Sequence, residues 1–520
     1  MNFLDLFRAT LPETVLETAA LLVLAVDLLF LRRVALKTRV AMAAFLGVLG
    51  CAVAGWALQF SAGVPFAFNG EVLLGSFGYI TIAQAGILVL TAITLLLLVE
   101  ETFTKHIGEF VAVVLMAAAG GLIVSAAQDL LVIFTGLELL SLGLYILTAF
   151  NKSSGKSAEA AVKYYLFGGM AAAFLLFGFS YFYGLTGSTN LAVIQRAILE
   201  QGASPLFYAA WILVVAGLAF KVAAVPFHLW APDAYEGAPA PAAAFIASVS
   251  KVASFALLLT IGGNWFLGSG QWVGSSHALI GYLHGVDQVW TKLAMVLLIL
   301  AGISMVVGNL AALAQTSVRR LLAYSAIAHA GYILLGAATF PHFAIAGGNL
   351  MDTMQKLSSF NLSANAVLYY ILTYGLTTIG AFGVVAVVER ATGSDKMDAF
   401  SGLYKRNPLL AAVLLVLFLS LAGIPPLVGF WAKFNLFAAV LNVGSGVVPF
   451  TLVALAIAMS AVSLYYYLQV LKRAFVVAPL EESPIQASPL TTAVLALIAL
   501  AIVLAGCFPT ILQNWIEAAY

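Results

Sequence analysis

Charged residues are scarce in this chain, and their scarcity identifies the solvent for which it is built. Only 9% of its 520 residues are Asp, Glu, Lys or Arg, whereas 63% are hydrophobic, and the mean hydropathy is +1.06. Soluble globular domains carry roughly 25% charged residues. The composition therefore excludes a soluble domain and predicts a chain that lies largely within a lipid bilayer.

The chain also lacks excess positive charge and cysteine. Its formal net charge is +1 and no basic patch or stripe stands out, which argues against nucleic-acid binding. The two cysteines, Cys51 and Cys507, lie in separate apolar segments and are too few for an iron–sulfur cluster or a cysteine zinc site. The sequence contains no dinucleotide fingerprint, since GSGQWVG at 268–274 has no strand before it, and no haem ligands are recognisable. We expect no cofactor and no metal in this chain.

Long apolar runs are what the chain does contain. Runs of about 20 residues predict an all-α integral membrane protein with about fourteen transmembrane helices. The first run carries three acidic residues and has no basic flank before it, so we expect a retained helix rather than a cleaved signal peptide. The fourth and fifth runs are nearly continuous and could be misjoined. The predicted spans are 12–31, 39–58, 77–98, 109–126, 129–149, 158–183, 207–230, 239–262, 290–312, 318–340, 364–388, 409–440, 447–471 and 489–510.

The distribution of Lys and Arg predicts an orientation. Fifteen of the 23 basic residues fall in the alternate loops that begin after the first helix, and four fall on the opposite side. Because cytoplasmic loops carry the excess of Lys and Arg, the fifteen mark the cytoplasmic side. An even number of helices then places both termini outside, which is the periplasm if the host is a Gram-negative bacterium.

The remaining four basic residues are lysines within predicted membrane spans. A lysine at the centre of a membrane helix costs about 2.5–3.5 kcal/mol, so such residues are candidates for function. Lys221 lies roughly 20 Å into the seventh span, Lys251 lies in the middle of the eighth, and Lys433 follows two prolines in the twelfth. Lys163 is close to the start of the sixth span and one turn after Glu159. It could therefore snorkel to the surface or form a simple ion pair.

One carboxylate and two histidines complete the set of candidates. Glu138 lies roughly 13 Å into the fifth span, where it would take up a proton unless a cation such as Lys221 stands near it. A static ion pair is the alternative. His329, in the middle of the tenth span, could pass a proton or could be merely hydrogen-bonded. His228 could be a member of a relay or a helix cap.

Prolines interrupt two of the spans, and this predicts an internal repeat. Pro226 follows Lys221 in the seventh span, while Pro425 and Pro426 precede Lys433 in the twelfth. A proline frees backbone carbonyls, which a membrane tolerates only inside protein or beside a water-filled cavity. Two broken helices five spans apart indicate inverted repeats made of helices 4–8 and 9–13. The predicted segments are an N-terminal three-helix part at 1–108, repeats at 109–262 and 263–472, and a last helix at 473–520.

Four strings in the second half of the chain carry a family resemblance. WAPDAYEGAPAPAAAF, NLAALAQTSVRRLLAYSAIAHAGY, GIPPLVGFWAKF and VSLYYYLQVLKRAF resemble the antiporter-like membrane subunits of respiratory complex I. Within that group, ELLSLGLYIL, EAAVKYYLFGG, TGSTNL and PDAYEGAP resemble the subunit N family of bacterial NADH–quinone oxidoreductase, the counterpart of subunit 2 in mitochondria and chloroplasts. The resemblance covers about residues 75–475. One departure is SVSKVA in the eighth span, which has no proline just before Lys251.

The resemblance implies a function for the buried charges. Glu138, Lys221, Lys251 and Lys433 would carry proton translocation, with Lys163 and His329 as intermediates. Protons would move from cytoplasm to periplasm, gated by Glu138, while quinone reduction elsewhere in the complex drives the movement. FMN, iron–sulfur clusters and quinone would belong to partner subunits. The expected partners are a neighbouring antiporter-like subunit, small connecting subunits and the lipid of the inner membrane.

Three other functions fit part of the sequence. A subunit of a multisubunit cation/proton antiporter would share the lysines and the broken helices. A stand-alone secondary transporter would need a substrate site, and we see none in the sequence. A structural subunit of the same membrane arm that pumps nothing would leave the four lysines within the spans unexplained.

Overall fold

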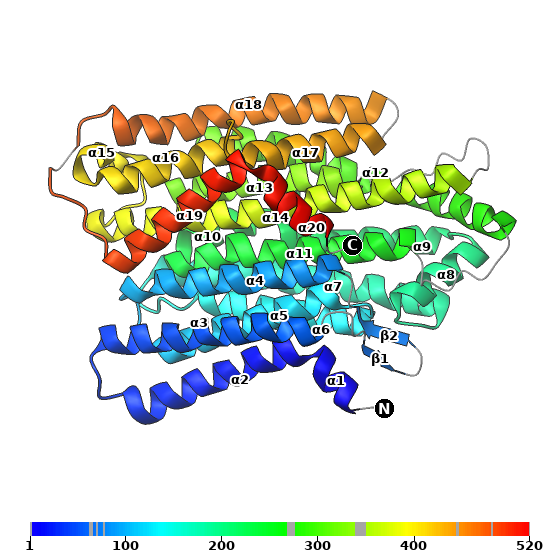
Figure 1. Cartoon of the computed structure of the whole chain (residues 1–520), viewed down its shortest axis with the longest axis horizontal. Helices are drawn as coiled ribbons and strands as arrows, with labels where there is room; N and C mark the ends of the chain where they lie inside the picture. Colours follow the sequence, from blue (N-terminus) through cyan, green and yellow to red (C-terminus); the bar gives the residue numbers. More distant parts are fainter. Residues whose placement is uncertain are drawn as a thin grey trace.

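The computed structural model describes residues 3–61, 66–68, 71–75, 78–267, 276–338, 350–443, 447–479 and 482–518. The stretch 268–274 lies outside these residues. Long helices pack side by side with their axes roughly parallel to one another (Figure 1). In hydrocarbon every backbone N–H and C=O must be satisfied within the protein, and a helix does this within its own segment. The prediction of an all-α membrane protein is confirmed.

The N-terminal part holds the predicted first three spans and one small hairpin. β1 and β2 pair antiparallel, and the sequence analysis did not predict them. The elements are α1 (Phe3–Ala9), α2 (Leu11–Val26), η1 (Asp27–Leu31), α3 (Leu36–Ser61), β1 (Phe66–Phe68), β2 (Glu71–Leu74), α4 (Gly78–Leu97) and η2 (Leu98–Glu100).

Two series of helices with the same order follow. Each has three long helices, then one or two short helices, then a helix broken into two parts, then one long helix. The first series is α5 (Ile107–Ala126), α6 (Leu130–Thr148), α7 (Gly155–Thr186), α8 (Leu191–Gln201), α9 (Pro205–Val222), α10 (Trp230–Gly237) and α11 (Ala240–Leu267). The second is α12 (Ser276–Leu313), α13 (Val318–Ala338), α14 (Leu350–Thr392), η3 (Met397–Phe400), α15 (Leu403–Arg406), α16 (Pro408–Ala422), α17 (Val428–Val443) and α18 (Val447–Phe475). The chain ends with α19 (Pro489–Cys507) and α20 (Pro509–Glu517).

The predicted spans correspond to these helices. Thirteen described helices are long and apolar enough to cross a membrane, and the shorter α16 and α17 together make the broken twelfth span. The fourth and fifth spans are separate helices, because Asp129 caps α6 by accepting a hydrogen bond of 2.8 Å from the Leu131 amide.

Both breaks lie at the predicted prolines. Between α9 and α10 the Val225–Pro226 bond is cis, and between α16 and α17 the Pro425–Pro426 bond is cis. Residues 231–238 lie between two predicted spans, and no helix was predicted for them. Residues 231–237 belong to α10, and Pro232 is compatible with it because it lies in the first turn, where a helix does not need the missing N–H.

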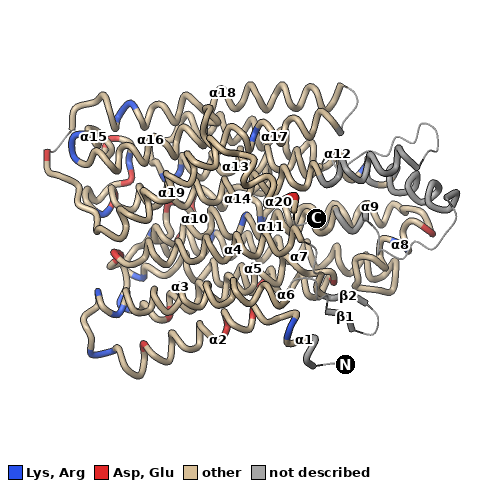
Figure 2. Tube along the Cα trace, in the orientation of Figure 1, with Lys and Arg blue, Asp and Glu red and all other residues tan. Residues whose placement is uncertain are grey.

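The burial of each helix shows which helices lie inside the bundle, and the positions of Lys and Arg distinguish its two ends. An 18-residue window of α11 is 100% buried and that of α13 is 94% buried, whereas the values for α2 and α18 are 28% and 22%. The helices that carry Lys251 and His329 are therefore the innermost ones. Lys and Arg gather at one end of the bundle, where α15 and the α2–α3 connection lie (Figure 2). We call this end the basic end.

Candidate functional site

Lys221 and Glu138 form the first buried ionic contact. Lys221, in the last turn of α9, extends toward α6, and its Nζ lies 3.9 Å from Glu138 Oε1. Its Nζ also donates a hydrogen bond of 2.5 Å to Ser141 Oγ. The Lys221 side chain is 7% exposed and that of Glu138 is 26% exposed. Lys221 therefore stands near Glu138, as the sequence analysis allowed, and the carboxylate is the more accessible member of the pair.

Lys251 bridges the two helix series. It lies on α11 and is 2% exposed, and its Nζ donates a hydrogen bond of 2.5 Å to the Ala326 carbonyl on α13. His329 follows one turn later on α13, where its Nδ1 lies 2.9 Å from the Tyr370 hydroxyl of α14. The Tyr374 ring contacts both residues, at 5.8 Å from Lys251 Nζ and 4.8 Å from the imidazole centroid. Lys251 and His329 therefore both pack against the Tyr374 ring in the core.

Lys433 lies at the second helix break. Its Nζ donates to the carbonyls of Leu421 and Ala422, at 3.1 and 3.0 Å, and to Ser460 Oγ at 2.8 Å. These carbonyls belong to the last turn of α16, where the helix has stopped supplying donors. The expectation that a break supplies acceptors to a lysine is correct here. A buried ammonium is thus held by neutral dipoles.

Gly423 fits its position beside Lys433 for two reasons. It caps α16 with φ of +86°, a conformation that an L side chain rarely adopts. A Cβ at this position would also lie 3.0 Å from Lys433 Cδ and 3.3 Å from its Nζ. Glycine therefore suits both the left-handed turn and the close approach of the lysine.

The first break is built differently. The Phe220 carbonyl at the end of α9 accepts a hydrogen bond of 3.0 Å from the Trp230 indole N–H rather than one from Lys221. The Val225 amide donates to Ser304 Oγ of α12 at 2.9 Å. The expected use of freed carbonyls by the lysine therefore does not hold at this break. The Trp230 side chain of α10 and the Ser304 side chain of α12 bind the free backbone groups at this break instead.

Asn309 connects the Lys433 region to two tyrosines. Its Nδ2 donates to the Tyr332 hydroxyl at 3.0 Å, and its Oδ1 accepts from the Tyr466 hydroxyl at 3.1 Å. The Tyr332 ring centroid lies 5.4 Å from Lys433 Nζ and 5.7 Å from the His329 ring. Tyr332 therefore contacts both the histidine and the lysine, and Asn309 holds its hydroxyl in place.

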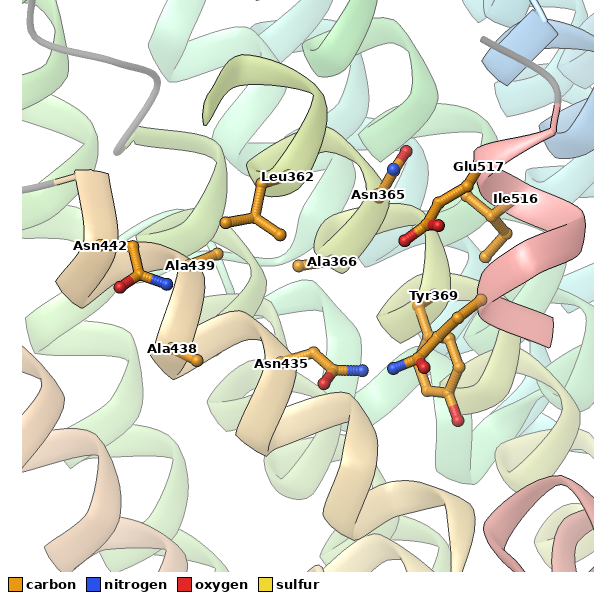
Figure 3. Close-up of a pocket in the computed structure, with 11 residues that line it drawn as sticks. Leu362, Asn365, Ala366, Tyr369, Asn435, Ala438, Ala439, Asn442, Ile516 and Glu517 are labelled. Atoms are coloured by element: carbon orange, nitrogen blue, oxygen red, sulfur yellow. The ribbon is translucent and has the colours of Figure 1, made fainter. Parts of the chain in front are cut away.

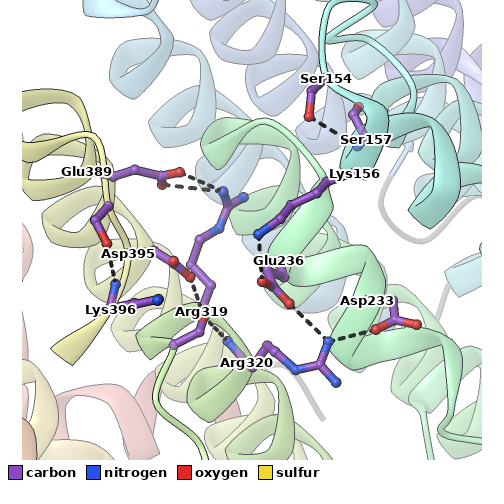
Figure 4. Close-up of polar contacts among 12 residues, drawn as sticks. Ser154, Lys156, Ser157, Asp233, Glu236, Arg319, Arg320, Glu389, Asp395 and Lys396 are labelled. Carbon is purple, nitrogen blue, oxygen red and sulfur yellow. Dashed lines mark hydrogen bonds and ion pairs between the residues drawn. The ribbon is translucent and has the colours of Figure 1, made fainter.

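A network of ion pairs occupies the basic end (Figure 4). Arg320 of α13 binds Asp233 and Glu236 of α10 at 2.7 and 2.9 Å. Asp233 in turn binds Lys163 at 2.8 Å, and Glu236 binds Lys156 at 3.3 Å. The network ties α7, α10 and α13 together across the two helix series.

A polar cavity opens beside this network. Its volume is 310 Å³, and its lining includes Lys156, Glu236, Arg319, Glu389 and the 238–240 link that leads into α11. Arg319 is only 5% exposed and binds Glu389 at 3.3 Å, while its Nε has no partner among the described residues. Such a volume holds several water molecules, because one needs about 10–15 Å³ of this space.

The positions of Lys163 and His228 differ from those of the other candidates. Lys163 binds Glu159 at 2.7 Å as well as Asp233, so the simple ion pair exists and is extended to α10. His228 is not a cap, because Leu229 is the N-cap of α10. The His228 Nδ1 is buried and has no hydrogen-bond partner among the described residues.

Several partners of the candidate residues were not predicted from the sequence. Ser141 could have been found, since it lies three residues after Glu138 and shares its helix face. Asp233 and Glu236 occur in the quoted string PDAYEGAP, but no local pattern indicates that they bind Arg320. Tyr370 and Ser460 gave no signal, because their partners lie far away in the chain.

The ion pairs of α10 should make stability depend on pH. Burial alone would raise the pKa of Asp233, but hydrogen bonds from Lys163 and Arg320 outweigh it and lower that pKa. The pKa of Glu236 is lowered in the same way, by Arg320 and Lys156. Their stabilisation is present above the unfolded-state pKa values near ~4 and is lost as pH falls through the lower folded-state values.

We therefore expect Asp233→Asn to lower the free energy of unfolding by roughly 1 kcal/mol at pH 7, because these pairs are partly exposed. The difference should shrink below about pH 4 as the wild-type carboxylate is protonated. Thermal unfolding of both proteins in detergent across this pH range measures it. A difference that does not change with pH would contradict the assigned ion pairs.

Three comparisons relate this arrangement to known proteins. The family model described as NADH:quinone oxidoreductase/Mrp antiporter, TM matches residues 127–281 and 263–460. A protein named NADH-quinone oxidoreductase subunit N 2, from Acidobacterium capsulatum, is 45% identical over 99% of both chains. A chain in the structure of respiratory complex I from Thermus thermophilus with bound aureothin is 32% identical, with a TM-score of 0.73 over 97% of this chain and 98% of that one.

A more distant structure shares the fold alone. A chain in the Mrp complex from Dietzia sp. DQ12-45-1b superposes with a TM-score of 0.78 at 20% identity. The match covers 98% of this chain and 51% of that chain. The architecture is therefore common to more than one kind of membrane complex, and the function has to be argued from the buried charges.

Proposed function

The chain belongs to the subunit N family of NADH–quinone oxidoreductase, and from that premise we propose that it translocates protons within the membrane arm of such a complex. It contributes no redox chemistry of its own. The observation that carries the proposal is the series of buried titratable side chains Lys221, Lys251, His329 and Lys433, all less than one-tenth exposed, on neighbouring helices of the core. Charges buried at this cost are retained where they serve transport.

Protons are taken up at the basic end, which is the cytoplasmic side. The 310 Å³ cavity there reaches the 238–240 link at the start of α11, the helix that carries Lys251. Its charged lining attracts water and can exchange protons with it. The position of this cavity supports proton uptake near the seventh and eighth predicted helices. Protons taken up there load Lys221 and Lys251.

Transfer across the bundle runs from Lys251 through His329 to Lys433. Lys251 binds the carbonyl one turn before His329, and Tyr332 contacts both His329 and Lys433. Neutral imidazole accepts a proton on one nitrogen while the other keeps a hydrogen bond, so His329 suits the middle position. From Lys433 the proton leaves to the periplasmic side. Lys163 joins the network at the uptake side, and His228, with its free nitrogen, is a candidate to exchange protons at the first break.

Glu138 acts as the gate. When its carboxylate is ionised 3.9 Å from Lys221, it holds the lysine in the charged form. Its 26% exposure lets a neighbouring subunit withdraw or neutralise it, whereupon Lys221 releases its proton. The coupling is thus an electrostatic change at one ion pair.

The remaining parts of the machine lie in partner subunits. These are a neighbouring antiporter-like subunit, the small connecting subunits, and the subunits that hold FMN, iron–sulfur clusters and quinone. The chain is a multi-pass protein of the inner membrane with both termini in the periplasm. Residues 109–262 and 263–472 are its two functional repeats, between the N-terminal segment 1–108 and the last helix in 473–520.

Purification of the complex in mild detergent tests this assignment. We expect the chain to co-purify with NADH-oxidising activity, flavin absorbance and the electron-paramagnetic signals of iron–sulfur clusters. Co-purification with cation/proton antiporter subunits that have no flavin or clusters would favour the antiporter function instead. A complex that pumps normally with the buried lysines removed would favour a purely structural role.

A further inference from the structure

A second cavity lies at the end of the bundle opposite the basic end. Its volume is 120 Å³, and it is enclosed by α14, α17 and the C-terminal helix α20 (Figure 3). The α17 side contributes Asn435, Ala438, Ala439 and Asn442, which recur at helical spacing along one face. We call this cavity the outer chamber. None of the residues used in the proposed transfer path lines it.

Polar groups line the outer chamber in a region that is otherwise apolar. Asn365 and Tyr369 come from α14, and Gln513 and Glu517 come from α20. Asn365 Oδ1 and the Tyr369 hydroxyl are buried and have no hydrogen-bond partner among the described residues. Tyr369 is only 1% exposed. A buried polar atom is normally satisfied by a partner or by water, so these two atoms favour a hydrated chamber.

The outer chamber begins at the same depth in the bundle as the end of the proposed transfer path. On α14, Tyr369 directly precedes Tyr370, whose hydroxyl lies 2.9 Å from His329 Nδ1. On α17, Asn435 is two residues beyond Lys433, and Asn442 is more than two turns beyond it, toward the end of the helix. The chamber therefore begins at the level of the last relay residues and extends outward. Glu517, an exposed carboxylate on α20, lies at its outer side.

We propose that the outer chamber is the hydrated outlet for protons leaving Lys433 and His329, and that Glu517 is the group that receives them at its mouth. This rests on the proposed function. Water held by Asn365 and Tyr369 carries the proton along the α14–α17 interface. The Glu517 carboxylate accepts it and then releases it to the aqueous phase. The short helix α20 thus supplies part of the transport route.

Cysteine labelling tests whether the chamber contains water. Ala438→Cys, in a Cys507→Ser background that removes the exposed native thiol, is treated with a charged methanethiosulfonate in right-side-out membrane vesicles. We expect modification of Ala438→Cys, because the reagent needs water to reach it. Phe434→Cys is the matched control. Its position is on the same helix and 52% exposed on the apolar surface, so we expect no modification.

Pumping by inverted vesicles prepared from the same membranes tests whether the chamber is on the route. We expect modified Ala438→Cys to lose most of its protons pumped per NADH, and Glu517→Gln and Tyr369→Phe to lower this ratio by roughly threefold. Tyr465→Phe, the same change at a 58% exposed position on α18, should leave it unchanged.

Two results would overturn the outlet. If Ala438→Cys resists the reagent, the chamber is dry. If it is modified and pumping is unchanged, the chamber is hydrated but off the route. Lys433→Ala separates this failure from failure of the proposed function. If Lys433→Ala stops pumping while the chamber variants pump normally, only the outlet is wrong. If Lys433→Ala also pumps normally, the proposed function itself fails.

Discussion

Replacing Lys221 by alanine is expected to reduce NADH-driven proton pumping by roughly tenfold or more while the complex still assembles. The change removes the ammonium that binds Ser141 and lies 3.9 Å from Glu138. The truncation also removes a buried charge that costs free energy, so assembly should survive it. Pumping by inverted membrane vesicles, normalised to quinone reduction, measures the effect.

Lys292→Ala is the control for this experiment. Lys292 is an exposed lysine on α12 whose Nζ lies over the Tyr208 ring at 5.2 Å, outside the buried series. The complex with Lys292→Ala should pump protons as the wild-type complex does. If Lys221→Ala pumps the wild-type number of protons per electron in an assembled complex, Lys221 is structural and the relay does not begin there.

The second large effect concerns the coupling between Glu138 and Lys221. Glu138→Gln removes the anion that holds Lys221 charged, so we expect a loss of pumping comparable to that of Lys221→Ala. Because the two residues act on one proton equilibrium, the double variant should be less impaired than the product of the two single defects. Glu138→Asp keeps the charge and should be milder than Glu138→Gln.

The measurement is proton pumping in reconstituted vesicles for both single variants and the double variant, with quinone reduction followed in parallel. Losses that add strictly in log rate would mean that the two side chains act independently. The gate assigned to Glu138 would then be wrong, even though the residues lie close together.

Short-range features of the sequence were enough to predict the membrane helices, the helix breaks and the charged residues within the spans. Apolar runs gave the membrane helices, because a 30 Å hydrocarbon layer demands about 20 apolar residues in each helix. Pro226 and the pair Pro425–Pro426 predicted the two helix breaks, because a proline cannot continue a helix. The lysines within the spans were recognisable from sequence because a charge in an apolar run conflicts with its surroundings. In each case the signal lies within a few residues of the feature.

Partners could not be predicted in the same way. Lys433 binds the carbonyls of Leu421 and Ala422 in the last turn of α16. In the last turn of α9 the Phe220 carbonyl instead binds Trp230, and Lys221 contacts Ser141 and Glu138. Each break carries a lysine and at least one proline, but the lysine precedes the proline at the first break and follows the prolines at the second. The difference in the lysine contacts depends on which helix packs beside each break.

The amino-acid sequence by itself determined the solvent, the helices, the two breaks and which side chains are charged within the membrane, since these follow from composition and short-range backbone chemistry. Only the tertiary structure decided that Lys251 reaches the helix of His329, that Arg320 joins Asp233 and Glu236, and that α20 closes a polar chamber over α14 and α17. These contacts join residues about 70 to 150 positions apart, and helix packing geometry, which local sequence does not encode, determines them.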